Sequence, residues 1–137
     1  MNGVPLLDTH AWVWWVERDR RLGLETVGIL DGLPPEERPY LCDISLWEVA
    51  MLVERKRLTF DIPLEEWIDA SAHPRTVRLL RITAAIAAET AVLPATFHRD
   101  PADRLIVSTC RVMGLPLLTS DRRILQSRLV PRWKPAA

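Results

Sequence analysis

Short apolar runs of strand length alternate with helical segments along the whole of this chain. The strand-length runs are Val4–Leu7, Pro39–Cys42, Thr76–Ile82 and Pro116–Thr119. The helical segments are Ala11–Val16, Leu24–Leu33, Ile44–Lys56, Leu64–Ala72, Thr83–Val92, Pro101–Met113 and Asp121–Ser127. Because parallel strands need a crossover connection, usually a helix, this alternation predicts an α/β sandwich with a mostly parallel sheet. Such sheets bind ligands outside the carboxyl ends of their strands.

The size and composition indicate an ordinary globular protein. The length of 137 residues fits a single domain spanning 1–137. The longest apolar run, Ala11–Val16, falls far short of the ~18 residues of a membrane span, and no secretion signal is recognisable. We therefore expect a cytoplasmic protein without a membrane partner, in which Cys42 and Cys110 are reduced and buried.

The net charge of zero conceals an asymmetry between the two halves of the chain. Residues 1–70 carry 14 acidic and 7 basic residues, whereas residues 71–137 carry 4 acidic and 11 basic ones. This asymmetry has two interpretations. It is either a solvated surface whose charges happen to be polarised, or a basic strip that binds a phosphate backbone beside an acidic region with another role.

Acidic residues stand at the ends of the expected strands and near the starts of the following helices. Asp8 follows the first strand, Glu48 lies one turn into the helix after the second, and Asp121 follows the last. Taken singly, each has an alternative role in capping, because acids are favoured at helix N-termini. Ser45 and Glu48, for example, match a capping box, and Thr9 could cap the first helix.

Helical periodicity weakens the capping alternative for two carboxylates. At about 100° per residue, Asp103 lies opposite an expected polar face formed by Arg104, Ser108 and Arg111. Glu48 belongs to a mostly apolar helix, on a narrow polar strip shared with Arg55. A carboxylate on an apolar face is costly unless it is paired or binds a metal.

Four converging carboxylates would repel one another unless cations neutralised them, and Mg²⁺ and Mn²⁺ are the hard cations that suit such ligands. An acidic pocket of this kind commonly hydrolyses phosphodiesters. The sequence has no HExxH or CxxC pattern for zinc and no glycine-rich phosphate loop.

Four segments resemble, in family order, the motifs of PIN domains, and in particular the VapC-like toxins of type II toxin–antitoxin pairs. They are LLDTHAWVWW at 6–15, SLWEV at 45–49, HRDPADRLIV at 98–107 and LLTSDRRI at 117–124. The closing VPRW at 130–133 also resembles their C-terminal strand. The resemblance implies a PIN-like three-layer sandwich with a short, mostly parallel central sheet flanked by helices.

The resemblance also implies a metal-dependent endoribonuclease that leaves a 5′-phosphate and a 3′-hydroxyl. Its catalytic and metal-binding residues would be Asp8, Glu48, Asp103 and Asp121. Thr119 or Ser120 would help to position the attacking water. Asp100 belongs to the third motif, where we interpret it as a helix N-cap with a supporting role at most. The implied cofactor is Mg²⁺ or Mn²⁺, and the implied partners are RNA, a cognate antitoxin that covers the cleft, and a second copy of the chain.

Several further residues have both a structural and a binding interpretation. We predict that four arginines beside the acids contact RNA phosphates. The alternative is that they are ordinary solvated surface residues. These are Arg99, Arg104, Arg122 and Arg123. Trp12, Trp15 and Val16 form a stripe at helical spacing, which we assign to the core or to a subunit interface rather than to base stacking. Trp14 lies off this stripe and is predicted to bind a partner. Trp47 and Met51 form a second stripe, either in the core or beneath the antitoxin.

Two non-catalytic alternatives remain at this point. One is a PIN fold retained only as a binding subunit. The other is a phospho-accepting receiver, which also has acids at strand ends but needs a lysine after its last strand. Lys56 and Lys134 are the only lysines, and neither fits that place well.

Overall fold

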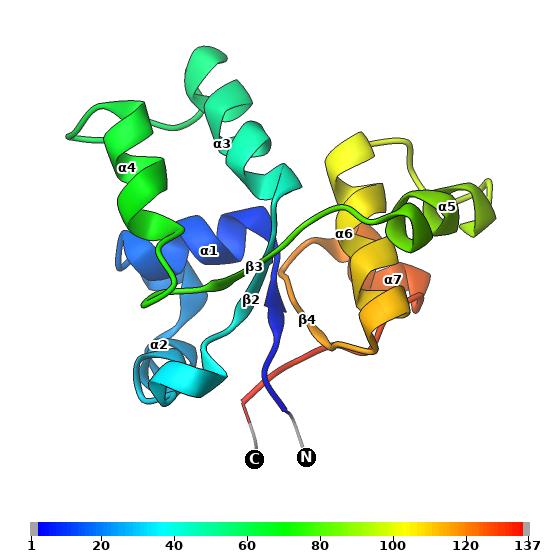
Figure 1. Ribbon diagram of the computed structural model, residues 1–137, viewed down its shortest axis with the longest axis horizontal. Helices are drawn as coiled ribbons and strands as arrows, with labels where there is room; N and C mark the ends of the chain where they lie inside the picture. The colour runs from blue at the N-terminus through cyan, green and yellow to red at the C-terminus, as the bar shows by residue number, and fades with distance from the viewer. Residues whose placement is uncertain (1–2, 136–137) are drawn as a thin grey trace.

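A four-stranded parallel sheet forms the centre of the molecule, which we describe for residues 3–135 from a computed structural model (Figure 1). The strand order is β3–β2–β1–β4. The strands are β1 (Leu6–Leu7), β2 (Tyr40–Cys42), β3 (Arg78–Leu80) and β4 (Leu117–Leu118). The helices are α1 (Thr9–Val16), α2 (Leu24–Asp31), α3 (Ile44–Glu54), α4 (Leu64–Ser71), α5 (Ala84–Val92), α6 (Pro101–Met113) and α7 (Arg122–Ser127), with short 3-10 turns at Arg20–Leu22 and Pro35–Glu37. The predicted fold class is confirmed.

The strands are shorter than predicted, because only two or three residues of each find a ladder partner. Leu6 pairs with Tyr40 on one side and with Leu117 on the other. The expected strand over 130–133 is reduced to a single parallel bridge between Leu117 and Arg132.

Neighbouring residues on each strand face opposite layers of helices. Leu7, Leu41 and Leu118 pack into one hydrophobic cluster, to which α1–α4 contribute. Their neighbours Leu6, Cys42 and Leu117 pack into a second cluster, with residues of α6 and α7. Figure 1 shows α1–α4 on one side of the sheet and α5–α7 on the other. The period of two along each strand thus produces the three layers.

Trp12 and Trp15, assigned from the sequence to the core or a subunit interface, lie in the core, and their indole N–H groups have partners. Trp12 donates to the carbonyl of Ser71 at 2.9 Å, and Trp15 donates to a carboxylate oxygen of Asp31 at the same distance. Cys42 and Cys110 are buried free thiols, as predicted.

The helix ends are set mainly by local side chains. Asp100 caps α6 through the backbone N–H of Asp103, and Asp121 caps α7. Asp8, rather than Thr9, caps α1, so the prediction for Thr9 was wrong. Gly114 ends α6 in the left-handed region at a φ of +67°, where a side chain would be strained.

One predicted helix face is wrong. Ser108 is fully buried rather than on a polar face with Arg104 and Arg111. Helix α6 packs against α5, α3 and β2, so little of its circumference is left for solvent.

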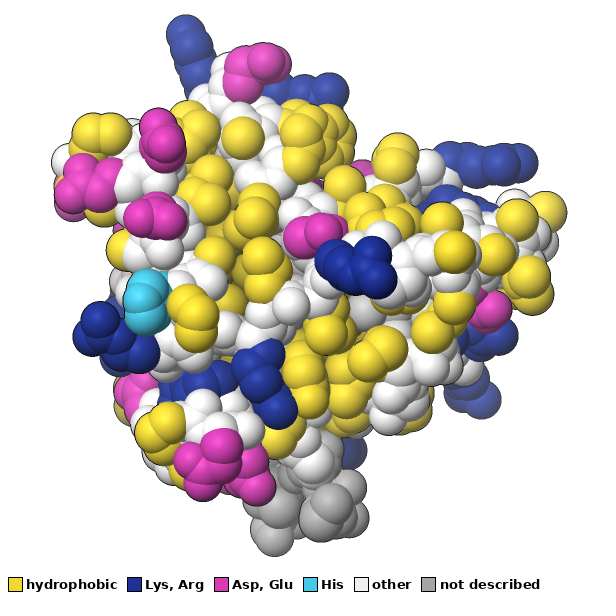
Figure 2. All heavy atoms as spheres, in the orientation of Figure 1, with side chains coloured by type: hydrophobic (Ala, Val, Ile, Leu, Met, Phe, Trp, Pro, Cys, Tyr) yellow, Lys and Arg dark blue, Asp and Glu magenta, His cyan; other side chains and the backbone are white. Residues whose placement is uncertain are grey.

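The charge asymmetry of the chain is visible on the surface. On the face drawn in Figure 2, acidic side chains gather over α4 and near the Pro35–Glu37 turn, whereas most of the charged side chains on the α5–α7 side are arginines. Within residues 3–135, no helix is both long and apolar enough to cross a membrane.

Candidate functional site

A cleft of about 440 Å³ opens where β1 and β4 end and α3 and α6 begin. It is lined by Asp8, His10, Trp14, Arg21, Glu48, Met51, Leu52, Arg55, Arg57, Asp100, Asp103, Ser120, Asp121 and Arg123. The structure therefore brings together all four acids singled out in the sequence. They come from four separate segments because the carboxyl ends of parallel strands meet at one edge of the sheet.

Asp8 is held by two hydrogen bonds at the end of β1. It accepts from the backbone N–H of Thr9 at 2.8 Å and from the hydroxyl of Thr119 at 2.6 Å. The Thr119 oxygen in turn accepts from the backbone N–H of Asp121 at 3.0 Å. Thr119 is therefore a buried link between two of the acids, whereas Ser120 is exposed and lines the cleft itself.

Glu48 does not take part in the capping box that its spacing suggests. Asp43 is the N-cap residue of α3, and no side chain caps this helix. Ser45 lies inside the helix, fully buried, with its hydroxyl 2.8 Å from that of Thr9. The Thr9 hydroxyl also donates to Glu48 Oε1. Contact with α1 thus takes Glu48 away from the backbone of its own helix and holds it at the cleft.

Asp100 joins the acidic cluster more closely than the sequence indicated. One oxygen from each of Glu48, Asp100 and Asp103 lies within 4.8 Å of the other two, an arrangement that could hold a metal ion. The predicted N-cap role is also present, since Asp100 accepts from the backbone N–H of Asp103 at 3.0 Å. Asp100 and Asp103 are three residues apart, which places both carboxylates at the same end of one helix. This spacing was the signal in the sequence that Asp100 could join the cluster.

The electrostatics of the cluster favour a bound cation. Burial raises the pKa of Asp103 to about 8, and the nearby charges of Asp8, Asp100 and Glu48 act in the same direction. Burial likewise raises the pKa of Glu48 to about 7, although the hydrogen bond from Thr9 opposes the shift. The pKa of Asp8 is also raised, chiefly by burial. An all-oxygen set of crowded carboxylates suits a hard divalent ion, which would offset their repulsion.

Two groups from the C-terminal half touch Asp103. Arg123 Nη2 lies 4.0 Å from Asp103 Oδ2 and 3.6 Å from Asp121 Oδ2. His98 Nε2 lies 3.2 Å from Asp103 Oδ2. Burial, reinforced by the charge of Arg123, lowers the pKa of His98.

The other predicted RNA-binding arginines lie elsewhere. The guanidinium of Arg104 donates to the backbone carbonyls of Phe97, His98 and Thr90, each at 3.1 Å, which is a structural role. Arg99 and Arg122 are exposed and do not line the cleft.

Three arginines that were not predicted to bind RNA, Arg21, Arg55 and Arg57, do line the cleft. The signal for Arg55 was its place on the polar strip of Glu48, seven residues further along the helix.

Of the three residues predicted to bind a partner, two line the cleft and one lies outside its lining. Trp14 is half-buried, lines the cleft and lies under the guanidinium of Arg21, 4.8 Å from the ring centre. Met51 also lines the cleft. Trp47 is 53% exposed, which is large for a tryptophan, and lies outside the lining. Their contact with a partner stays a prediction.

Comparisons with known proteins agree on one family. The family model of the PIN domain matches residues 6–129. Ribonuclease VapC22 of Mycobacterium tuberculosis is 36% identical over 124 residues, covering 90% of this chain and 91% of that protein.

Solved structures share the fold at lower identity. The crystal structure of FitAcB from Neisseria gonorrhoeae matches with a TM-score of 0.69 and 22% identity, covering 96% of this chain and 98% of that one. A toxin–antitoxin complex from Klebsiella pneumoniae matches with a TM-score of 0.64 and 19% identity, covering 96% and 99%.

Proposed function

Because this chain belongs to the PIN-domain family, we propose that it is a metal-dependent endoribonuclease, the toxin of a type II toxin–antitoxin pair. The observation that carries the proposal is the convergence of Asp8, Glu48, Asp103 and Asp121 in one cleft. The 36% identity to a protein named as a ribonuclease supports RNA as the substrate. The receiver alternative is disfavoured because neither Lys56 nor Lys134 is among the residues lining the cleft.

The acids would hold Mg²⁺ or Mn²⁺, with Glu48, Asp100 and Asp103 offering the tightest group of oxygens. When bound, such an ion supplies Lewis-acid activation of water and neutralises charge on the phosphodiester. Thr119 keeps Asp8 oriented through its hydrogen bond, and the exposed Ser120 hydroxyl can orient the attacking water. Arg123, Arg55 and Arg57 line the same cleft and would hold the RNA phosphates.

The proposed reaction is hydrolysis. The water oxygen forms a bond to phosphorus, the bond from phosphorus to the 3′ oxygen breaks, and that oxygen takes a proton. The products are a 5′-phosphate and a 3′-hydroxyl.

We further propose that residues 1–137 act as one domain in the cytoplasm, as a homodimer, with an antitoxin covering the cleft. The solved toxin–antitoxin complex from Klebsiella pneumoniae, which shares this fold, supports an antitoxin partner. Trp14, Met51 and the exposed Trp47 offer apolar contacts in and near the cleft.

The test is cleavage of a labelled RNA pool by the purified chain with Mn²⁺, with Mg²⁺ and with EDTA. We expect metal-dependent cuts that Asp103→Asn abolishes. The matched control is Asp61→Asn, the same chemical change at an exposed residue outside the cleft, which should cut like the wild type. A folded wild-type chain that cuts nothing with either metal would overturn the proposal in favour of a binding subunit.

A further inference from the structure

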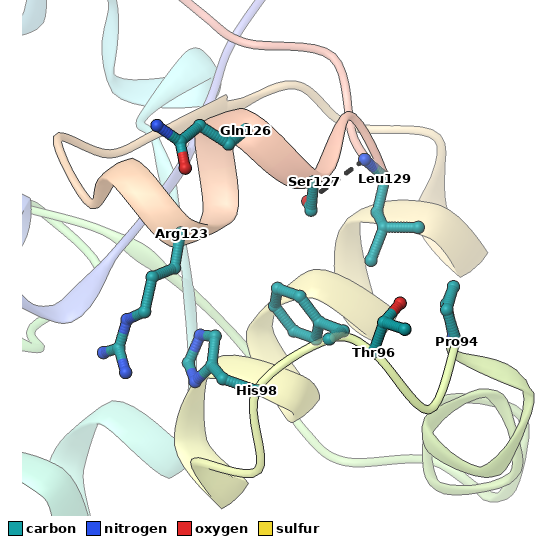
Figure 3. A pocket seen from close by; sticks show the side chains of 8 residues that line it. Pro94, Thr96, His98, Arg123, Gln126, Ser127 and Leu129 are labelled. Carbon is teal, nitrogen blue, oxygen red and sulfur yellow. Dashed lines mark hydrogen bonds between the residues drawn. The ribbon is translucent and has the colours of Figure 1, made fainter.

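We propose that a second cavity, beside the acidic cleft, binds an unpaired nucleobase of the RNA next to the phosphate that is cut. This inference rests on the proposed function and adds a specificity site to it. The cavity has a volume of about 360 Å³ and lies between the 94–98 loop and α7 (Figure 3). It is lined by Pro94, Thr96, Phe97, His98, Arg123, Gln126, Ser127 and Leu129.

The base cavity and the acidic cleft are neighbours that share a lining residue. Arg123 lines both of them, and Figure 3 shows its side chain extending from α7 towards His98. His98 lines the base cavity while its Nε2 lies 3.2 Å from Asp103 Oδ2. Arg123 and His98 therefore separate the two spaces. A nucleotide whose phosphate lies against the acids has its base at the entrance of this cavity.

The chemistry of the lining fits a heterocyclic base. The His98 side chain is 16% exposed and offers its ring to the cavity, whereas Phe97 is 5% exposed and supports that ring from 4.6 Å between ring centres. Pro94 and Leu129 add apolar surface. Proteins that recognise unpaired RNA bases stack them on aromatic rings and read their edges by hydrogen bonds, and the cavity is within the range of small-ligand sites.

The groups that could read the base edge are available. Within residues 3–135, the Thr96 hydroxyl and the Gln126 carboxamide make no hydrogen bond to the protein, and both residues are exposed. The Ser127 hydroxyl is different, because it already donates to the carbonyl of Ile124 and accepts from the N–H of Leu129. Gln126 offers both a donor and an acceptor, the pair that a base edge presents.

The loop that carries Phe97 is held in place before any ligand binds. Arg104 donates to the carbonyls of Phe97, His98 and Thr90, which ties the loop to α6 and to the end of α5. The N–H of Phe97 also donates to the carbonyl of Pro94 at 3.0 Å. A preformed cavity binds more tightly because less conformational entropy is lost on binding.

The first experiment measures binding without cleavage. The full chain is titrated with AMP, GMP, CMP, UMP and ribose 5-phosphate, and the Gln126 side-chain amide and Phe97 ring are followed by NMR. We expect at least one nucleotide to shift both signals, and ribose 5-phosphate, which lacks a base, to leave Gln126 unshifted. Gln126→Leu should weaken the preferred nucleotide about tenfold, the effect of one or two lost hydrogen bonds. Thr96→Val should weaken it less, and Thr59→Val, at an exposed threonine outside the cavity, should leave it unchanged.

The second experiment separates this proposal from the proposed function. Cut sites in an RNA pool are mapped for the wild type and Gln126→Leu, and we expect the base preference beside the cut to change. RNA cleavage with no nucleotide shift at Gln126 or Phe97 and an unchanged cut profile would overturn the base cavity and leave the ribonuclease standing. Nucleotide binding in the cavity without any cleavage would support the cavity and overturn only the ribonuclease. Shifts produced by an antitoxin and by no nucleotide would assign the cavity to a protein partner and overturn the proposal.

Discussion

Replacing Asp103 by asparagine should make the metal-free protein more stable at neutral pH, although it removes a proposed metal ligand. Asp103 is 7% exposed and its pKa is raised to about 8 by burial and by the neighbouring charges of Asp8, Asp100 and Glu48. In the unfolded chain the same carboxyl has its ordinary pKa of about 4. The folded state therefore keeps a proton that the unfolded state releases, and folding opposes ionisation.

The sign of this effect fixes its dependence on pH. When the pKa of a carboxyl group is higher in the folded protein than in the unfolded chain, the free energy of unfolding falls as the pH rises above the unfolded-state pKa. It stops falling once the pH exceeds the folded-state pKa. Linkage gives a loss of about 3–4 kcal/mol between pH 5 and pH 8 from Asp103 alone. Glu48, with its pKa raised to about 7, acts in the same direction. Asparagine cannot ionise, so the advantage of the variant should grow by about 3–4 kcal/mol over this interval.

The assay is urea unfolding followed by tryptophan fluorescence, at pH 5, 6, 7 and 8 in EDTA. Adding Mn²⁺ should then stabilise the wild type, by about 2.7 kcal/mol at a hundred times its dissociation constant, and stabilise Asp103→Asn less. Asp61→Asn is the control, and its difference from the wild type should not depend on pH in this range. The reasoning is refuted if Asp103→Asn is less stable than the wild type by the same amount at pH 5 and pH 8.

Three further predictions concern the surroundings of the site. Thr119→Val removes the hydroxyl that donates to Asp8, so it should lower the free energy of unfolding in urea by about 1–3 kcal/mol and slow RNA cleavage. Equal stability of variant and wild type would contradict a stabilising hydrogen bond between Thr119 and Asp8. Gly114→Ala places a side chain at a φ of +67° and should cost about 1 kcal/mol in the same assay, with cleavage retained, whereas a more stable variant would argue against strain at this turn. Arg104→Met removes the donors to three backbone carbonyls, so it should lower the free energy of unfolding by about 3 kcal/mol and speed limited proteolysis within residues 93–100. An unchanged pattern of proteolysis would show that the loop does not depend on Arg104.

Local patterns in the sequence were enough to predict the fold class and much of the site. The alternation of strands and helices predicted the parallel sheet, and the topology of such a sheet places Asp8 and Asp121 at one edge. The N-cap signal of Asp100 depends on residues a few positions apart, and this cap is present in the structure. Periodicity also indicated that Asp103 was buried.

Only the packing of distant segments decided which partner each side chain has. Glu48 accepts from Thr9 rather than from the N–H of Ser45, because α1 packs beside α3 and offers a hydroxyl across the interface. Arg104 was predicted to face solvent and RNA, yet the 93–100 loop folds back over it and presents carbonyl groups.

The contact of His98 with Asp103 arises in the same way, as the 93–100 loop folds back onto the start of α6. Sequence periodicity reports the face of a helix on which a residue lies. It carries no information about what a neighbouring element, dozens of residues away or across a loop, places opposite that face, because that depends on the tertiary packing of the whole chain.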